Sequence, residues 1–367
     1  MDYSHILRTD FGFDDKLLAT YEDLKRYKTA DKEELIKMLI SIEASSGLCA
    51  ALLLLYRQQV ESGFVLADPA DTTDKEFYNL YDDKTGVTFH IQWNPERELR
   101  KNHALLVERG IIDPAADKHK LVNKDGQGKA CYLCPGNINI QNPAEIIYPV
   151  RLVDEEYFLG ANFAYLADNH FTLFNNTHRP QLYRREVIAF LLDFLDKTKG
   201  CFRGIFNGLA GASIEHHEHM QVTTEKFPIE DIIVSPGSLI KNNEKIKVSQ
   251  PYYYTSLLLL ESIYKEEIVK YADAFLLKWH ELNPKNHTEN LVVVKQSMLY
   301  RLFIFPRDRY KLAGKGKIGA MASFEASGNI VLSDMAIERA TFDKVSLASV
   351  QNMLAGINPA DRLPVSF

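Results

Sequence analysis

Cysteines and long hydrophobic runs are both scarce in this sequence. Four cysteines in 367 residues argue against a fold held together by a disulfide framework. The most apolar window, at residues 48–56, is too short to cross a bilayer. The N-terminus lacks a basic region followed by an apolar run, so no signal peptide is predicted. These absences favour a cytoplasmic protein that does not bind membranes.

The sequence also lacks an excess of positive charge. Its formal net charge is −6, with 25% charged residues. A nucleic-acid-binding protein needs a positive surface, so we expect no nucleic-acid partner, and any phosphate site must be a local cluster. The hydrophobic content of 46% is ordinary for a globular protein. The length accommodates one large domain or two of medium size.

The spacing of apolar residues changes along the chain, without a close repeat. Helical spacing over 35–60, after a helix start at 31–34, predicts a helical extension at 1–75. Residues 111–130 are polar and predict a loop. Strands are predicted at 88–93, 145–153, 157–166, 170–175, 204–206, 290–295, 302–307 and 330–332, and helices at 183–199, 252–264, 266–282 and 342–354. Because residues 76–234 and 235–367 both combine strands with one long helix, we predict two structurally duplicated halves after the extension.

The segment Gly-Ala-Ser-Ile-Glu-His-His-Glu-His-Met-Gln at 211–221 has the most informative pattern. Read as a strand, it places His217, His219 and Gln221 on one face, because side chains alternate with period 2. Imidazole can attack phosphorus and leave again, so a fixed histidine can carry a covalent intermediate. The alternative is an exposed strand with chance histidines.

This segment resembles the active-site strand of the histidine-triad superfamily in its His-x-His-x-Gln form. That form is typical of the branch with galactose-1-phosphate uridylyltransferase and the dinucleoside tetraphosphate phosphorylases, and the run Asn-Gly-Leu-Ala-Gly-Ala-Ser at 207–213 is similar to the phosphorylase turn. The resemblance implies an α+β fold of two diverged histidine-triad-like halves, each with an antiparallel sheet and a long helix. It covers 85–355 loosely. Residues 1–75 and 111–130 have no counterpart in the characterised enzymes. The Trp-Asn-Pro stretch at 93–95 and the Cys-rich segment together also suggest an uncharacterised bacterial subfamily.

The resemblance also implies roles for individual residues. His219 is the expected nucleophile, with its other ring nitrogen held by the carbonyl of His217, and Gln221 is expected to bind a phosphate oxygen. Gln221 stands where the hydrolytic branch has a third histidine, which favours transfer over hydrolysis. The expected substrate-binding residues are Asn207, Gly211, Ser213, Lys295 and Arg307. The alternatives are an ordinary tight turn at 207–213 and a solvated strand edge around Lys295 and Arg307.

A Cys-x-x-Cys turn at 131–134 indicates a metal site. Two thiolates at this spacing can bind one tetrahedral zinc, although a redox pair or two buried thiols are alternatives. Similarity to the zinc-binding uridylyltransferases implies a structural zinc with four ligands: Cys131, Cys134, His178 and His217. His170 is the main rival to His178, but we expect it to be a strand histidine bonded to the backbone. Cys49 and Cys201 are predicted to be core residues.

Together these patterns predict a nucleotidyltransferase that works through a nucleotidyl-histidine. The expected substrate is a dinucleoside polyphosphate or a nucleotide sugar, with phosphate or a sugar phosphate as acceptor, and a homodimer is possible. One alternative is a hexose-1-phosphate uridylyltransferase, although His280 and His287 do not reproduce the second-half histidine cluster of those enzymes. Another is an inactive, zinc-stabilised nucleotide-binding protein.

Overall fold

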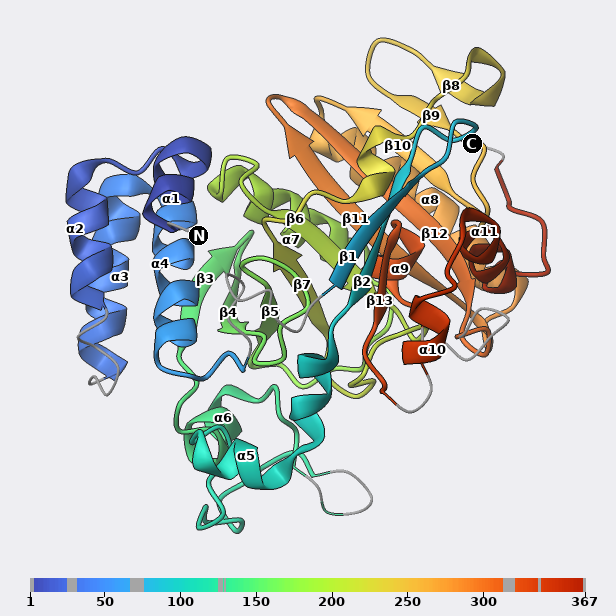
Figure 1. Ribbon diagram of the computed structural model, residues 1–367. Coiled ribbons are helices and arrows are strands. Elements are labelled where there is room, and N and C mark those ends of the chain that lie inside the picture. Colours follow the sequence, from blue (N-terminus) through green and yellow to red (C-terminus); the bar gives the residue numbers. More distant parts are fainter. Residues whose placement is uncertain are drawn as a thin grey trace.

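A ten-stranded sheet forms the centre of the molecule, with the strand order β3-β4-β5-β7-β6-β11-β12-β10-β9-β8. The computed structural model describes residues 3–24, 32–66, 76–124, 128, 130–312, 321–335 and 338–365. Long helices pack on one face of the sheet, and a three-stranded sheet with short helices packs on the other (Figure 1). The predicted α+β class is confirmed. The expected boundary at 75/76 adjoins a segment outside the described residues.

The large sheet consists of two halves with the same topology. The elements of the first half are β3 (Ile147–Leu152), β4 (Glu155–Ala161), β5 (Phe171–Asn175), α7 (Arg185–Lys197), β6 (Arg203–Asn207) and β7 (His219–Thr223). Those of the second are β8 (Leu239–Asn242), β9 (Lys247–Ser249), β10 (Leu258–Ser262), α8 (Lys265–Leu282), β11 (His287–Gln296) and β12 (Leu299–Asp308). Counted from each outer edge, the strands follow the same order, and β6 pairs with β11 in the middle. This repeated order supports the predicted duplication.

Two of the predicted helices differ from the structure. Residues 252–264 contain the strand β10 instead of a helix. Leu258 and Leu260 are buried in the core beneath the long helices, whereas Leu257 and Leu259 are buried on the opposite face. A run buried on both faces has no alternation, so its periodicity cannot separate strand from helix. The helix predicted at 342–354 is two helices, α10 (Arg339–Phe342) and α11 (Leu347–Gly356).

The N-terminal extension is helical, as predicted, with α1 (Tyr3–Phe11), α2 (Asp15–Leu24), α3 (Lys32–Ser46) and α4 (Leu48–Glu61). Gly47 separates α3 from α4 because its φ of 94° is a backbone conformation that only glycine adopts readily. The leucines of α4 are buried in the same core as α7 and the sheet. The extension therefore completes the core of the first half.

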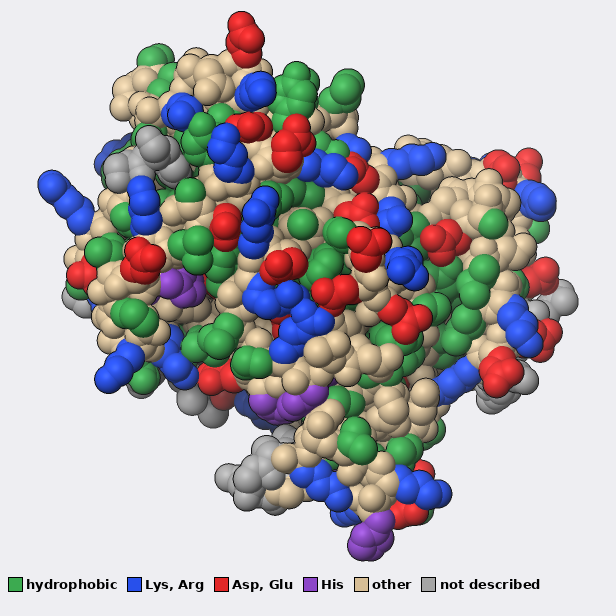
Figure 2. All heavy atoms as spheres, turned by 180° about the vertical axis from the view of Figure 1, so that it is seen from behind, with side chains coloured by type: hydrophobic (Ala, Val, Ile, Leu, Met, Phe, Trp, Pro, Cys, Tyr) green, Lys and Arg blue, Asp and Glu red, His purple; other side chains and the backbone are tan. Residues whose placement is uncertain are grey.

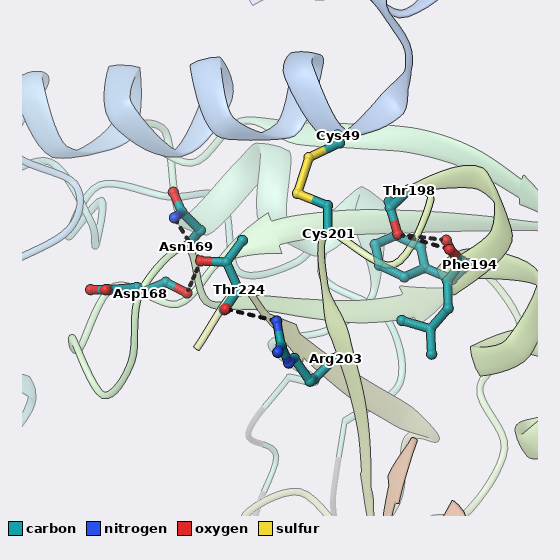
Figure 3. The surroundings of a disulfide bond; sticks show 9 residues. Cys49, Asp168, Asn169, Phe194, Thr198, Cys201, Arg203 and Thr224 are labelled. Atoms are coloured by element: carbon teal, nitrogen blue, oxygen red, sulfur yellow. Dashed lines mark hydrogen bonds between the residues drawn. A yellow bond between two sulfur atoms is a disulfide. The ribbon is translucent and has the colours of Figure 1, made fainter. Parts of the chain in front are cut away.

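A disulfide joins the extension to the first half. Cys49 on α4 is bonded to Cys201, which lies between α7 and β6 and is 152 residues away in sequence (Figure 3). Both cysteines pack against the core as expected, and their bond, which was not predicted, is a single cross-link rather than a disulfide framework. Sequence spacing could not show the bond, because only the packing of α4 against the α7–β6 junction brings the two sulfurs together.

The smaller sheet covers the face of the large sheet opposite α7 and α8. It consists of β1 (Glu76–Tyr81), β2 (Thr88–Trp93) and β13 (Asn329–Leu332), and β13 pairs with β2 in parallel. Near it lie η2 (Pro95–Lys101), η3 (Pro228–Asp231) and α9 (Ser323–Ala326). The helix α5 (His103–Glu108) follows η2, α6 (Pro135–Gln141) packs against β3 and β5, and η4 (Pro236–Ser238) precedes β8. The hydrophobic core between the two sheets thus joins segments that are far apart in sequence.

The surface shows no segregation of charge on the face drawn in Figure 2, where acidic and basic side chains alternate. Among the described residues, none of the helices combines the length and the apolar composition that a membrane span needs.

Candidate active site and metal cluster

The four predicted metal ligands lie together. One donor atom from each of Cys131, Cys134, His178 and His217 lies within 4.8 Å of the others. The two thiols precede α6 and are buried, and His217 lies just before β7. His217 Nε2 is 2.9 Å from the carbonyl oxygen of Asn175, which leaves Nδ1 facing the sulfurs.

The distances in this cluster fit a tetrahedral zinc ion. His217 Nδ1 is 3.3 Å from the Cys131 sulfur and 3.7 Å from the Cys134 sulfur. Zinc bonds of about 2.3 Å to sulfur and about 2.1 Å to nitrogen place such atoms about 3.6 Å apart in a tetrahedron. The Nε2 atom of His178 is buried and has no hydrogen-bond partner, so it too is available as a ligand. Burial lowers the pKa of His217 to about 4, which keeps its ring in the neutral form that binds metals.

The expected nucleophile, His219, is the first residue of β7. The strand predicted over 211–221 therefore starts later than expected, and residues 211–218 form a turn and loop. His219 Nδ1 lies 2.9 Å from the carbonyl oxygen of His217, as the resemblance implies. Burial lowers the pKa of His219, so its ring is neutral. A neutral ring that donates from Nδ1 has a bare Nε2, the form that can attack phosphorus.

Gln221 is oriented by His170, a contact that the sequence did not reveal. His170 Nε2 is 3.3 Å from Gln221 Oε1, and the imidazole is buried with its pKa lowered to about 4. The expectation that His170 bonds to the backbone is therefore wrong. Because His170 donates to the amide oxygen, the NH₂ group of Gln221 remains free to donate to a ligand.

A cavity of about 360 Å³ lies beside Gln221. Four of the predicted site residues line it: Asn207, Gly211, Ser213 and Gln221. Gly211 has a φ of 102°, and a Cβ there would lie 2.6 Å from the Cβ of Ala322, so this turn requires glycine. The turn thus approaches α9 closely and brings its backbone to the cavity. His219 precedes Gln221 on the same strand face and is only 4% exposed.

The other two predicted substrate-binding residues are not brought to this cavity. Lys295 forms an ion pair of 2.7 Å with Asp196, at the end of α7. Arg307 is fully buried, where it donates hydrogen bonds to Asn290 Oδ1 and to the carbonyl oxygen of Lys311. Asn290 in turn donates to Asn207 Oδ1 at 2.9 Å and to the carbonyl oxygen of Ala210 at 2.8 Å. Arg307 therefore supports the turn from behind, and Lys295 faces the layer of helices.

Two arginines that were not predicted as site residues line the cavity instead. Arg97 and Arg100 belong to η2, which follows the strand β2. Burial lowers the pKa of Arg97, and Glu325, which also lines the cavity, is the opposing charge that most offsets this shift. The sequence signal for these residues was a pair of arginines three positions apart, directly after a predicted strand. The pair reaches the cavity at Gln221 only because of how the small sheet packs.

Further side chains fix the backbone around His219. The amide of Gln181 donates to the carbonyl oxygens of Asn207 and His219, and its oxygen accepts the His219 backbone N–H at 2.7 Å. Glu218 is buried and forms a bidentate ion pair with Arg184. These contacts hold the ends of β6 and β7 in register beside the turn.

Comparison with known proteins gives two kinds of match, although no protein-family model matches the chain. In sequence, it is 27% identical over 267 residues to galactose-1-phosphate uridylyltransferase 1 of Streptococcus pneumoniae, covering 64% of this chain and 54% of that protein. It is also 27% identical over 161 residues to the galactose-1-phosphate uridylyltransferase of Fusobacterium nucleatum, covering 41% of this chain and 31% of that one. The chain thus spans about half or less of the curated relatives it matches.

In structure, the chain is similar to yeast Ap4A phosphorylase Apa2. The complex of that enzyme with AMP gives a TM-score of 0.51 at 13% identity, covering 83% of this chain and 96% of the yeast chain. Its complex with Ap4A gives 0.51 at 12% identity, with 85% and 98% covered. The fold is histidine-triad-like. The sequence and structural matches fall in the same branch, that of the uridylyltransferases and the Ap4A phosphorylases.

Proposed function

We propose that this protein is a nucleotidyltransferase that works through a nucleotidyl-His219 intermediate. The observation that carries the proposal is the His219 ring, which is neutral and donates from Nδ1 to the carbonyl of His217. Its Nε2 would attack the α-phosphorus of the substrate, forming an N–P bond while the bond to the leaving phosphate oxygen breaks. An acceptor oxygen then takes the nucleotidyl group and releases the histidine.

The cavity residues supply the electrostatic requirements of this reaction. In this proposal the free NH₂ group of Gln221 and the turn at 207–213, which line the cavity, would hold the reacting phosphate. Preorganised donors of this kind stabilise the charge that develops on the non-bridging oxygens. Arg97 and Arg100 would neutralise the phosphates of the leaving group. Substrates with several phosphates, such as dinucleoside polyphosphates and nucleotide sugars, fit this distribution of charge.

We further propose that Cys131, Cys134, His178 and His217 bind a structural zinc ion. Four protein ligands would complete the coordination shell of the ion, so no coordination position would remain open for substrate. Its effect on the reaction is indirect, since His217 supplies both a ligand nitrogen and the carbonyl that orients His219.

The second candidate function is hexose-1-phosphate uridylyl transfer, because the sequence relatives carry that name. Both candidates share the histidine intermediate and differ in the nucleotide and the acceptor. Mass spectrometry of a trapped adduct distinguishes them, since the mass added to the protein identifies the nucleotide.

The test of the shared chemistry is kinetic. A covalent intermediate gives ping-pong behaviour, with parallel double-reciprocal plots and isotope exchange between donor and first product without acceptor. His219→Ala should abolish both exchange and labelling while the protein stays folded, and His216→Ala, which changes the neighbouring histidine, should retain both. Exchange that strictly requires the acceptor would show direct transfer and refute the nucleotidyl-histidine. Tight nucleotide binding without labelling would support an inactive binding protein.

A further inference from the structure

A second cavity, of about 220 Å³, lies next to the cavity at Gln221. We call it the neutral pocket. Its polar residues come from β1, β2, β13 and the segment after β7: Asn79, His90, Gln92, Asn329 and Glu225. Phe77 on β1 also lines it and is 54% exposed, so one edge of the pocket carries an accessible aromatic ring.

We call the cavity at Gln221 the catalytic cavity. It and the neutral pocket lie side by side and are lined by neighbouring residues of the same elements. Leu166 lines both. Strand β2 contributes His90 and Gln92 to the neutral pocket, and η2, which follows β2, contributes Arg97 to the catalytic cavity. Strand β13 likewise contributes Asn329 to one and Val331 to the other. A ligand anchored by phosphate in the catalytic cavity can therefore extend along the small sheet into the neutral pocket.

The chemistry of the two cavities differs. The catalytic cavity presents two arginines, whereas neither lysine nor arginine is among the described residues that line the neutral pocket. His90 Nδ1 is 3.1 Å from Asn329 Oδ1, and Asn329 Nδ2 donates to Glu225 Oε1 at 3.0 Å. Burial raises the pKa of Glu225 to about 8, with Asp168 adding to the effect, and burial lowers the pKa of His90. Both groups are therefore mainly uncharged at neutral pH.

From this geometry we propose that the neutral pocket binds the nucleobase of the substrate. A nucleobase is a planar, uncharged heterocycle whose edge carries hydrogen-bond donors and acceptors and whose faces are apolar. The amides of Asn79 and Gln92 match the edge, and Phe77 offers a ring on which the face can stack. A phosphate group would meet no lysine or arginine among the described residues that line the pocket. The inference rests on the proposed function, because it takes the catalytic cavity as the phosphate site.

The test is calorimetric binding to the 367-residue protein prepared with zinc. The probes are ATP, GTP, UTP and CTP, inorganic tripolyphosphate, which has no base, and glucose 1-phosphate, which has a sugar but no base. We expect at least one nucleotide to bind more tightly than tripolyphosphate. Phe77→Ala and Gln92→Ala should each weaken that nucleotide about tenfold, since stacking and a hydrogen bond each contribute about that factor. Neither variant should change the affinity for tripolyphosphate.

Arg100→Ala is the matched control, because it should weaken the nucleotide and tripolyphosphate alike. Phe77 is exposed, so its variant should melt at the wild-type temperature and report on binding alone. Three results would each overturn the proposal: equal binding of nucleotides and tripolyphosphate, equal losses for both probes in the Phe77 and Gln92 variants, or a loss for glucose 1-phosphate alone. Base-dependent binding without a covalent adduct at His219 would leave the pocket intact and refute the transferase.

Discussion

Gln221 shows how one neighbouring residue can decide the chemistry of another. An amide offers both an oxygen and an NH₂ group, and only the NH₂ group can donate to a phosphate oxygen. His170 fixes the orientation of the Gln221 amide, because its Nε2–H donates to Oε1. The His170 ring also contacts the Phe324 ring, with 5.5 Å between their centroids. We therefore regard His170 as a positioning residue that acts through Gln221.

Replacing His170 by phenylalanine tests this role. His170→Phe keeps an aromatic ring beside Phe324 but removes the donor, so the amide of Gln221 can rotate. We expect the transfer rate to fall about 5- to 10-fold, since an ordinary hydrogen bond contributes about 1 kcal/mol. Gln221→Ala should cost about 10²–10³, as for other donors that stabilise developing charge. The rate constants of both half-reactions should be measured for the wild-type protein and for each variant.

The double variant provides the control. If His170 acts through Gln221, the double variant should be no slower than Gln221→Ala alone, because there is no amide left to orient. Additive losses would show that His170 contributes by another route, and the positioning role would be wrong.

At the scale of elements, the metal cluster joins the turn before α6 to the ends of the paired strands β5 and β7. Cys131 and Cys134 precede α6, His178 follows β5, and His217 precedes β7. A metal bound there would fix the loop before β7 and with it the carbonyl of His217 that orients His219.

Metal removal should therefore lower both stability and activity. We expect about one zinc per chain by elemental analysis, since the four ligands form one tetrahedral site. Cys131→Ser should reduce the zinc content and the melting temperature, because one thiolate ligand is lost. His216→Ala is the control, since His216 lies beside His178 but outside the cluster, and it should keep its metal. A folded, metal-free wild-type protein, or equal loss of zinc in the control, would exclude the zinc site.

At the scale of the whole molecule, the disulfide between Cys49 and Cys201 closes a long loop through the extension and the first half. Such a cross-link reduces the conformational freedom of the unfolded chain, and native disulfides typically contribute about 2–4 kcal/mol. A cytoplasmic location stays a prediction, and reducing conditions there would normally keep this pair as thiols.

Reduction should consequently lower the melting temperature of the wild-type protein. Cys49→Ser should melt at the reduced wild-type temperature and should not respond to dithiothreitol. Under denaturing conditions with a chelator, we expect two reactive thiols, those of Cys131 and Cys134. Four reactive thiols in protein purified without reductant would show that the bond does not form.

Much of the local structure could be predicted from the sequence. The periodicity at 183–199 and 266–282 indicated α7 and α8, since an amphipathic helix records its buried face in its spacing. The pair of strands β11 and β12 was likewise predicted. The cluster of Cys131, Cys134, His178 and His217 was inferred by resemblance, because ligand motifs persist when the rest of a sequence diverges.

Only the tertiary structure decided which charged residues reach the cavity and how its walls are built. Lys295 and Arg307 followed the expected pattern, yet one faces α7 and the other supports Asn290 from behind. Arg97 and Glu325 meet only because β13 pairs with β2 across more than half of the chain. The same holds for Cys49 with Cys201 and for His170 with Gln221. A sequence determines its periodic elements and short motifs through local contacts, whereas contacts between distant segments depend on packing that no local pattern encodes.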